Sequence, residues 1–271
     1  MNKKVNIAVI GAGWWCTEFH LPYLSSLNNV NILSVCRFGK KELSLVKNKY
    51  RIEHASEDFK EALSYKELDG AIIATPHTAH FDCAKEALKN KLHIIVEKPM
   101  TTSSKLAKQL YLLSKKNRKQ IIIPYGYNFT HYMDKARQFI LKGKIGKIKH
   151  IDGSMSSGTL DLFGGKGLLE AKKHTFQPLK STWSDPNKAG GYGWGQTSHL
   201  LGAIFKLVNA TPEKLFCMHL NSPTKVDYTN AVSMNFKENI TASISGCAYL
   251  PKNKEEHIEI KIHGSKGTLF L

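Results

Sequence analysis

The sequence predicts an α/β protein whose N-terminal doubly wound parallel sheet precedes a second domain with an open, mainly antiparallel sheet. Three observations carry this prediction. Residues 1–125 alternate short apolar runs with helical stretches, a Gly-Ala-Gly turn follows the first run, and residues 126–271 change to longer alternating segments. Strand–helix repeats favour parallel pairing, whereas successive alternating strands favour antiparallel pairing. We therefore expect a boundary between two domains, 1–125 and 126–271.

The first apolar run, Val5–Ile10, contains no charge, which is typical of a strand buried on both faces. Gly11 permits a tight turn after it, and Gly13 lets a phosphate approach the backbone. The helix that follows directs free N–H groups and the positive end of its dipole to the same place. This is the first half of a dinucleotide-binding fingerprint, with Cys16 at the third glycine position. An ordinary strand-to-helix turn explains G-x-G alone equally well.

The rest of the first half continues the alternation of strands and helices. We predict strands over 31–36, 70–74, 92–96 and 120–125, and helices over 40–50, 57–64, 79–90 and 103–116. Each of these strands is short, apolar and followed by a helix, as in a doubly wound sheet.

The second half has a different pattern. We predict helices over 132–142 and 198–208, and strands over 147–156, 213–220, 230–236, 240–249, 257–263 and 268–271. Residues 157–190 are rich in Gly, Lys, Ser and Pro and show no clear period, and so long a loop is usually functional or disordered. We expect a mostly antiparallel sheet with one or two helices on one face.

Composition excludes several classes of protein. Of 271 residues, 42% are hydrophobic, which is enough for a core, and no run of eighteen apolar residues predicts a membrane span. The chain enters its first strand directly, without the apolar stretch of a signal peptide. Its five cysteines are scattered and form no C-x-x-C pair. We expect reduced thiols in a cytoplasmic protein, with no disulfide framework and no metal site.

The net charge of +17 raises the question of nucleic acid. Arginine, which forms bidentate hydrogen bonds with guanine and phosphate, occurs only at positions 37, 51, 118 and 137. The lysines are spread over predicted helix faces. We interpret the charge as a solvated surface that attracts anionic ligands, and expect no nucleic-acid partner. Nucleic-acid binding would instead produce a salt-sensitive gel shift.

Arg37 directly follows the second predicted strand. In NAD-binding units an acidic side chain at this point accepts hydrogen bonds from the ribose 2′-OH. A guanidinium would pair with a 2′-phosphate instead, so we favour NADP(H) over NAD. Alternatively, Arg37 is a surface residue that stacks on adenine, which fits either cofactor.

Polar residues follow two further predicted strands, at the carboxyl ends where ligands of open sheets bind. Thr75, Pro76 and later His80 come after the strand at 70–74, and Glu97-Lys98-Pro99 comes after the strand at 92–96. Lys98 could donate to a substrate hydroxyl or carbonyl, although a strand-end charge is the simpler interpretation. The Lys98–Pro99 bond is a candidate cis peptide.

Together these segments resemble one known family. The order GAGxxCxxxH, ATPHTAH, ALKNKLHIIVEKP, GYN and a distal AGGYGWGQTSH is similar to the Gfo/Idh/MocA family of oxidoreductases over nearly the whole chain. VEKP is the most specific part of the pattern and G-x-G the least specific. The resemblance implies a Rossmann domain and an α/β domain. It also implies NAD(P)-dependent oxidation or reduction of a sugar, cyclitol, nucleotide sugar or related polyol.

The resemblance also implies roles by position. Gly11, Gly13, Trp14 and Trp15 would hold the pyrophosphate, and Arg37 would meet the adenosine ribose. The dinucleotide would be lined by Thr75, Pro76 and His80, with Glu97 and Lys98 beside the nicotinamide. Asn128 and Tyr127 would contact the nicotinamide or the substrate.

The family's D-x-x-x-H element implies an Asp and a His beside the substrate. The His is His199, but the Asp position is Gly195. His199 would carry the proton while Lys98 binds the reacting oxygen, and Gln196 or Tyr192 would position the substrate. A helix-capping or partly buried histidine is the other interpretation of His199. Trp183 and Trp194 fit either a sugar-stacking wall or aromatic packing.

The sequence also departs from the family in length, because Leu271 falls inside a predicted strand and later strands would be missing. An unpaired apolar strand end favours aggregation, so we expect the C-terminal sheet to form a homo-oligomer. A non-catalytic NAD(P)-binding sensor or interaction protein is the rival hypothesis, favoured by Cys16, Gly195 and the early end. The substrate, the reaction direction and the subunit number stay open.

Overall fold

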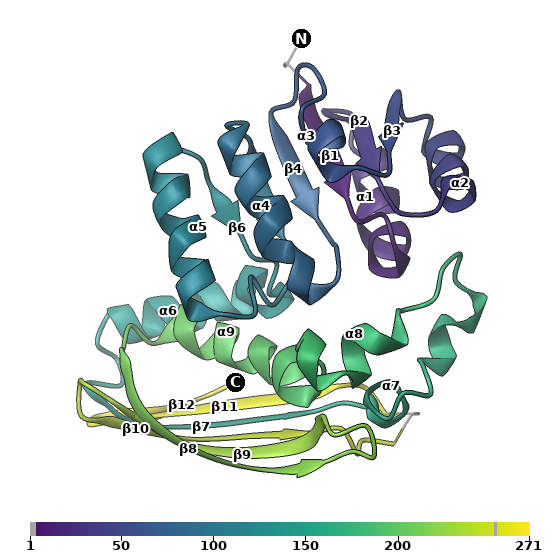
Figure 1. The fold of residues 1–271 in the computed structure, drawn as a ribbon. Coiled ribbons are helices and arrows are strands. Elements are labelled where there is room, and N and C mark those ends of the chain that lie inside the picture. Colours follow the sequence, from purple (N-terminus) through teal and green to yellow (C-terminus); the bar gives the residue numbers. More distant parts are fainter. Residues whose placement is uncertain (1–3, 252–253) are drawn as a thin grey trace. The chain divides into compact units, whose positions relative to one another are not determined.

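The structure is a computed structural model that describes residues 4–251 and 254–271. The chain forms two compact units (Figure 1). The first comprises Met1–Pro124 and Leu168–Thr182, and the second comprises Tyr125–Gly167 and Trp183–Leu271. A segment from the second half of the sequence is thus part of the first unit. None of the described helices has the length and apolar character needed to cross a bilayer.

The first unit contains a six-stranded sheet with every neighbouring pair parallel, in the order β3-β2-β1-β4-β5-β6. Its strands are β1 Val5–Ile10, β2 Val30–Cys36, β3 His54–Ser56, β4 Gly70–Ile73, β5 His93–Val96 and β6 Ile121–Ile122. The predicted doubly wound parallel sheet is confirmed. Strand β3 was not predicted, because its three residues contain no apolar run.

Helices cover both faces of this sheet. They are α1 Leu21–Ser25, α2 Lys40–Tyr50, α3 Phe59–Leu63, α4 His80–Lys89 and α5 Ser104–Asn117, with a π-helical turn at Cys16–His20 before α1 and a 3-10 turn at His77–Ala79 before α4. Apolar side chains of α1 and α2 pack on one face, and those of α3, α4 and α5 pack on the other. Helix α3 starts where Asp58 accepts a hydrogen bond from the Lys60 N–H at 2.8 Å, which satisfies a free donor of its first turn.

The second unit contains a six-stranded sheet in the order β12-β11-β7-β10-β9-β8. Its strands are β7 Ile148–Ser156, β8 Pro212–Asn221, β9 Asp227–Phe236, β10 Ile240–Cys247, β11 His257–Gly264 and β12 Gly267–Phe270. Only β7 and β10 pair in parallel among these neighbours. The predicted open, mainly antiparallel sheet is confirmed.

Two helices, α6 His131–Leu141 and α9 Ser198–Leu207, cover one face of this second sheet (Figure 1). Shorter helical turns complete the unit and its connections: Gly126–Phe129, α7 Leu160–Phe163, Leu169–Lys173, α8 Lys180–Ser184, Pro186–Lys188 and the π-helical Gly193–Thr197. The helical turns within the stretch 157–190 have only three to five residues each. Such turns are too short to produce a hydrophobic period.

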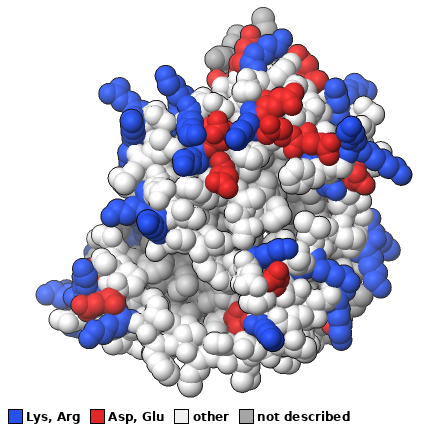
Figure 2. Space-filling model, viewed as in Figure 1, with Lys and Arg blue, Asp and Glu red and all other residues white. Residues whose placement is uncertain are grey.

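Charged side chains are dispersed on the face shown in Figure 2. Lysine and arginine stand there in several separate groups, with acidic side chains between some of them. This distribution fits a solvated surface better than one continuous basic track.

Candidate functional site

The loop after β1, at residues 11–13, is a candidate anion cradle. Gly11 adopts a φ of +87°, and the N–H groups of Gly11 and Ala12 both donate to the Cys36 carbonyl, at 2.9 and 3.1 Å. A Cβ on Gly13 would meet no atom closer than 3.9 Å, so the backbone there is open to an incoming group. The helix begins directly after it, where first-turn N–H groups have no helical partner. These residues fit the pyrophosphate of a dinucleotide.

Cys16 occupies the third glycine position of the fingerprint and is fully buried. The segment Cys16–His20 is π-helical, and this wider turn accommodates a thiol where glycine usually allows close packing. Burial raises the pKa of the Cys16 thiol far above its ordinary range. Cys16 is therefore an inert packing residue rather than a nucleophile.

Arg37 reaches from the end of β2 to the same loop. Its Nη1 donates to the Ala12 carbonyl at 2.8 Å and lies 4.0 Å from where a Gly13 Cβ would stand. Its Nε is buried and has no hydrogen-bond partner within the described part of the chain. A guanidinium can only donate. Arg37 therefore has one donor that the described residues do not use, and an anionic ligand could accept from it.

Glu97 joins the segment after β5 to the helix after β1. Its Oε1 accepts hydrogen bonds from the Trp15 indole at 3.0 Å and from His20 Nε2 at 2.8 Å, and its Oε2 accepts from the Lys98 N–H at 3.1 Å. Burial raises the pKa of the Glu97 carboxyl, but the hydrogen bond and charge of His20 and the charge of Lys98 outweigh burial and hold that pKa below its ordinary value. Glu97 is thus ionised at neutral pH.

These contacts bring Lys98 and the Gly13 loop to one edge of the sheet, since β1, β4 and β5 are neighbours. Lys98 is half-buried, and the Lys98–Pro99 bond is cis, as predicted. His20 was not assigned a role from the sequence. The available signal was its place in GAGxxCxxxH, seven residues after Gly13 in the chain.

His80 holds two loops of this edge together. Its ring is fully buried, and its two nitrogens contact the Pro99 carbonyl at 2.7 Å and the Thr75 carbonyl at 2.8 Å. Burial lowers the pKa of His80 more than the two carbonyls raise it, which favours the neutral ring, and a neutral ring has one N–H and donates to only one of the two carbonyls. We therefore expect His80 to position Thr75 rather than to touch a dinucleotide itself. Pro76 is exposed beside them.

In the second unit, His199 is the second residue of α9 and is half-buried. The rings of Tyr125 and Tyr127 meet it edge to face, with centroids 5.7 and 6.3 Å away. The Tyr127 hydroxyl donates to Glu256 at 3.2 Å, and burial together with the Glu256 charge raises the pKa of Tyr127. Aromatic rings thus limit how His199 can turn.

Asn128 lies next to Tyr127, in the turn Gly126–Phe129. Its Oδ1 is buried and has no hydrogen-bond partner among the described residues, so it can accept one from a ligand. Gln196 is half-buried in the turn Gly193–Thr197, one turn before His199.

Tyr192 does not line a surface. It is fully buried, and its hydroxyl donates to the Met155 carbonyl at 3.1 Å and contacts the Ser157 hydroxyl at 3.2 Å. Burial raises its pKa, so it stays neutral. The expectation that Tyr192 positions the substrate is therefore corrected: it is a core residue that joins β7 to the segment before α9.

The described residues supply an anion cradle, a half-buried lysine at the same sheet edge, and a histidine set among tyrosines. Among them, no group of three or more His, Cys, Asp and Glu side chains is arranged to hold a metal ion.

Both halves of the chain match one family. Residues 5–125 match the oxidoreductase family with an NAD-binding Rossmann fold, and residues 133–270 match the GFO/IDH/MocA C-terminal domain. The chain belongs to the Gfo/Idh/MocA family. Its fold is shared with scyllo-inositol dehydrogenase from Lactobacillus casei, solved with bound NAD(H) and scyllo-inositol. That match has a TM-score of 0.80 and 18% identity, and it covers 99% of this chain and 76% of that chain.

Two curated Gfo/Idh/MocA relatives differ in how much of their length this chain matches. An uncharacterised oxidoreductase of Synechocystis is 23% identical over 285 residues, which span 100% of this chain and 73% of that protein. The D-xylose 1-dehydrogenase [NADP(+)] of Haloarcula marismortui is 26% identical over 165 residues, which span 59% of this chain and 46% of that enzyme. The match therefore spans less than half of the xylose enzyme.

The Gfo/Idh/MocA pattern D-x-x-x-H is broken at Gly195, and the structure gives a physical reason. A Cβ at position 195 would lie 2.9 Å from Phe163 Cζ and 3.4 Å from Trp183 Cζ3. The rings of Phe163 and Trp183 pack edge to face, 6.3 Å apart, and fill this space. Trp183 is half-buried and packs against Phe163, whereas Trp194 is 40% exposed.

We expect Gly195→Asp to destabilise the protein rather than to restore the family pattern. The new side chain must displace an aromatic ring and bury a carboxylate, which costs about 2–4 kcal/mol. Urea unfolding checks this, with Gly126→Asp as the matched control because a Cβ there meets nothing within 4 Å. A Gly195→Asp protein as stable as the parent would contradict this account.

Proposed function

We propose that this protein is an NAD(P)-dependent oxidoreductase that transfers a hydride between nicotinamide and a sugar, cyclitol or nucleotide-sugar alcohol or ketone. The observation that carries the proposal is that Glu97, next to Lys98, accepts hydrogen bonds from Trp15 and His20 in the helical segment after β1. The lysine after β5 and the anion cradle after β1 therefore lie at the carboxyl ends of two strands of one parallel sheet. Ligands of open α/β sheets bind at this edge.

The chain's own residues have distinct parts in this proposal. When bound, the nicotinamide accepts or supplies the hydride. Lys98 donates to the reacting oxygen and stabilises negative charge on it. His199 takes the alcohol proton during oxidation and returns one during reduction, a task for which histidine is suited near neutral pH. Asn128, Tyr127 and Gln196 are the proposed contacts to nicotinamide or substrate.

For the cofactor, we propose a preference for NADP(H), with NAD(H) as the alternative. Arg37 supports the preference because it directly follows β2, where an acidic residue would bind the NAD ribose, and because its Nε has no hydrogen-bond partner among the described residues. The relatives include both kinds: the xylose enzyme is named for NADP(+), and the scyllo-inositol enzyme holds NAD(H).

The test has two stages. A thermal-shift titration with NAD(H) and NADP(H) should raise the melting temperature, because a ligand that binds only the native state stabilises it. Reduction of NAD(P)+ is then followed at 340 nm, the usual absorbance of the reduced nicotinamide, over a panel of polyols, aldoses and nucleotide sugars. Turnover on the panel supports the enzyme. Binding without turnover supports the rival, a cofactor-binding sensor, which Gly195 favours.

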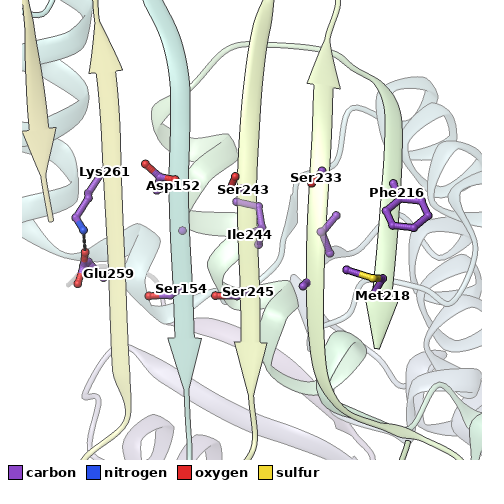
Figure 3. A pocket seen from close by; sticks show the side chains of 13 residues that line it. Asp152, Ser154, Phe216, Met218, Ser233, Ser243, Ile244, Ser245, Glu259 and Lys261 are labelled. Carbon is purple, nitrogen blue, oxygen red and sulfur yellow. Dashed lines mark ion pairs between the residues drawn. The ribbon is translucent and has the colours of Figure 1, made fainter. Parts of the chain in front are cut away.

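We also propose that the outer face of the second sheet pairs with a second copy of the chain. Opposite α6 and α9, a shallow depression of about 590 Å³ lies over β11, β7, β10, β9 and β8 (Figure 3). Its floor carries the short side chains of Ser154, Ser233, Ser243 and Ser245. Phe216 and Met218, 65% and 62% exposed, stand at one side, and the Glu259–Lys261 ion pair stands at the other. Small side chains allow a second sheet to approach closely.

We expect Ser243→Arg to convert the oligomer into monomers, because a long charged side chain would stand in the middle of the paired faces. Light scattering after size-exclusion chromatography measures the mass. Ser25→Arg on α1 is the matched control, because Ser25 is exposed outside this face. A monomeric parent protein, or a Ser243→Arg protein with unchanged mass, would refute the interface.

We propose a reducing, cytoplasmic setting as well. All five cysteines are free thiols, and Cys16, Cys36 and Cys83 are buried in the first unit. Reaction of the unfolded chain with a thiol reagent should count all five without prior reduction.

A further inference from the structure

A short strap from the second half of the sequence packs on the nucleotide-binding loop. The strap is His174-Thr175-Phe176, within Leu168–Thr182, which belongs to the first unit. The Trp14 indole donates to His174 Nδ1 at 2.7 Å, and the planes of the two rings are inclined by only 15°. The Thr175 N–H donates to Glu18 Oε1 at 3.2 Å. Two consecutive strap residues are thus hydrogen-bonded to the start of the helix after Gly13.

Phe176, the third strap residue, holds Arg37. The Arg37 Cζ lies 3.6 Å from the centroid of the Phe176 ring, which also packs against the apolar cluster around β1 and β2. A cation over an aromatic face is attracted by the ring quadrupole, more strongly where water is excluded. With the bond from Arg37 to the Ala12 carbonyl, the guanidinium is held at two points beside the anion cradle.

The guanidinium of Arg37 has one donor that no described residue uses. Nε of Arg37 is buried without a hydrogen-bond partner among the described residues, and its planar geometry suits two oxygens of one phosphate. A flexible arginine must lose rotamer freedom when it binds, whereas one already fixed by a ring and a carbonyl loses less. The resulting increase in affinity is large for a ligand group that bonds the guanidinium strongly, such as a 2′-phosphate, and small for a ribose hydroxyl.

We propose that Phe176 is a specificity-determining positioning residue: by fixing Arg37 beside Gly13, it makes the site prefer a dinucleotide that carries a 2′-phosphate. The inference rests on the proposed function, and it adds to that function a residue from outside the Rossmann sequence. Phe176 itself acts through Arg37 and not through a contact with the reacting atoms.

The experiment compares Phe176→Leu, which keeps apolar bulk without a π face, with Phe176→Tyr, which keeps the ring. Dissociation constants for NADP+ and NAD+ are measured on the full chain by isothermal titration calorimetry. We expect Phe176→Leu to weaken NADP+ binding roughly three- to thirtyfold and NAD+ binding less than twofold, and Phe176→Tyr to bind both like the parent. A changed ratio of the two constants is a readout that general loosening of the fold would not produce.

Three results would overturn the proposal. Equal weakening of both nucleotides would show that the ring only supports the fold. Tighter binding by Phe176→Leu would show that the strap blocks the site. A parent protein that binds NAD+ more tightly than NADP+ would refute the 2′-phosphate preference while leaving the oxidoreductase intact, whereas a parent that binds neither nucleotide would refute the proposed function itself.

Discussion

Lys98→Ala is expected to lower kcat/KM for the alcohol substrate by about 10²–10³, the usual loss when one donor to a developing oxyanion is removed. Lys98 is half-buried at the sheet edge, and its N–H is bonded to the ionised Glu97. A positive charge held in this setting stabilises negative charge on the reacting oxygen more than a solvated lysine would. Steady-state kinetics of the parent and variant, at saturating cofactor, measure the loss.

The control for Lys98 is Lys89→Ala, because Lys89 lies at the end of α4 and pairs with the neighbouring Glu86 on the surface. It should leave kcat and KM unchanged. Cofactor dissociation constants of Lys98→Ala should stay within about threefold of the parent, since in the proposed mechanism the lysine acts on the substrate oxygen and the glycine loop binds the pyrophosphate. Full turnover by Lys98→Ala would remove the lysine from the mechanism.

The parallel sheet could be predicted because its central strands are buried on both faces. Val5–Ile10 and Gly70–Ile73 are apolar runs without charge, and a run of that kind has few other places in a fold. Their order along the chain, with helices between them, then requires parallel pairing. The position of Lys98 followed from the same rule, because the carboxyl ends of parallel strands share one edge.

Some of the shortest elements could not be predicted. Strand β3 has three residues and α7 has four, so neither repeats an apolar position often enough to be recognised. The position of the strap could not be predicted either. His174 and Phe176 are ordinary residues in a loop rich in Gly, Lys and Ser, and only tertiary packing sets them on Trp14 and Arg37.

Burial of polar aromatic residues was likewise not readable from the sequence. Tyr192 and His80 have the chemistry of site residues, and both stand in segments that resemble the family's site. In the structure the Tyr192 hydroxyl donates to a backbone carbonyl, and the two ring nitrogens of His80 lie against backbone carbonyls inside the fold. A buried polar group must find such partners, and their positions depend on residues far apart in the chain.

Gly11→Ala is expected to lower the free energy of unfolding by about 3–4 kcal/mol, because two costs add at this position. A φ of +87° is strained for any residue with a Cβ, and that Cβ would lie 2.6 Å from Thr75 N and 2.7 Å from Ala74 C, both backbone atoms at the end of β4. Gly13→Ala is the matched variant, since its Cβ meets nothing closer than 3.9 Å. It should unfold at the parent's urea concentration yet lose dinucleotide affinity, because the methyl would fill the space that we propose for a phosphate. If the two variants lost stability equally, Gly11 would not be the joint between β1 and β4, and the cradle would need another explanation.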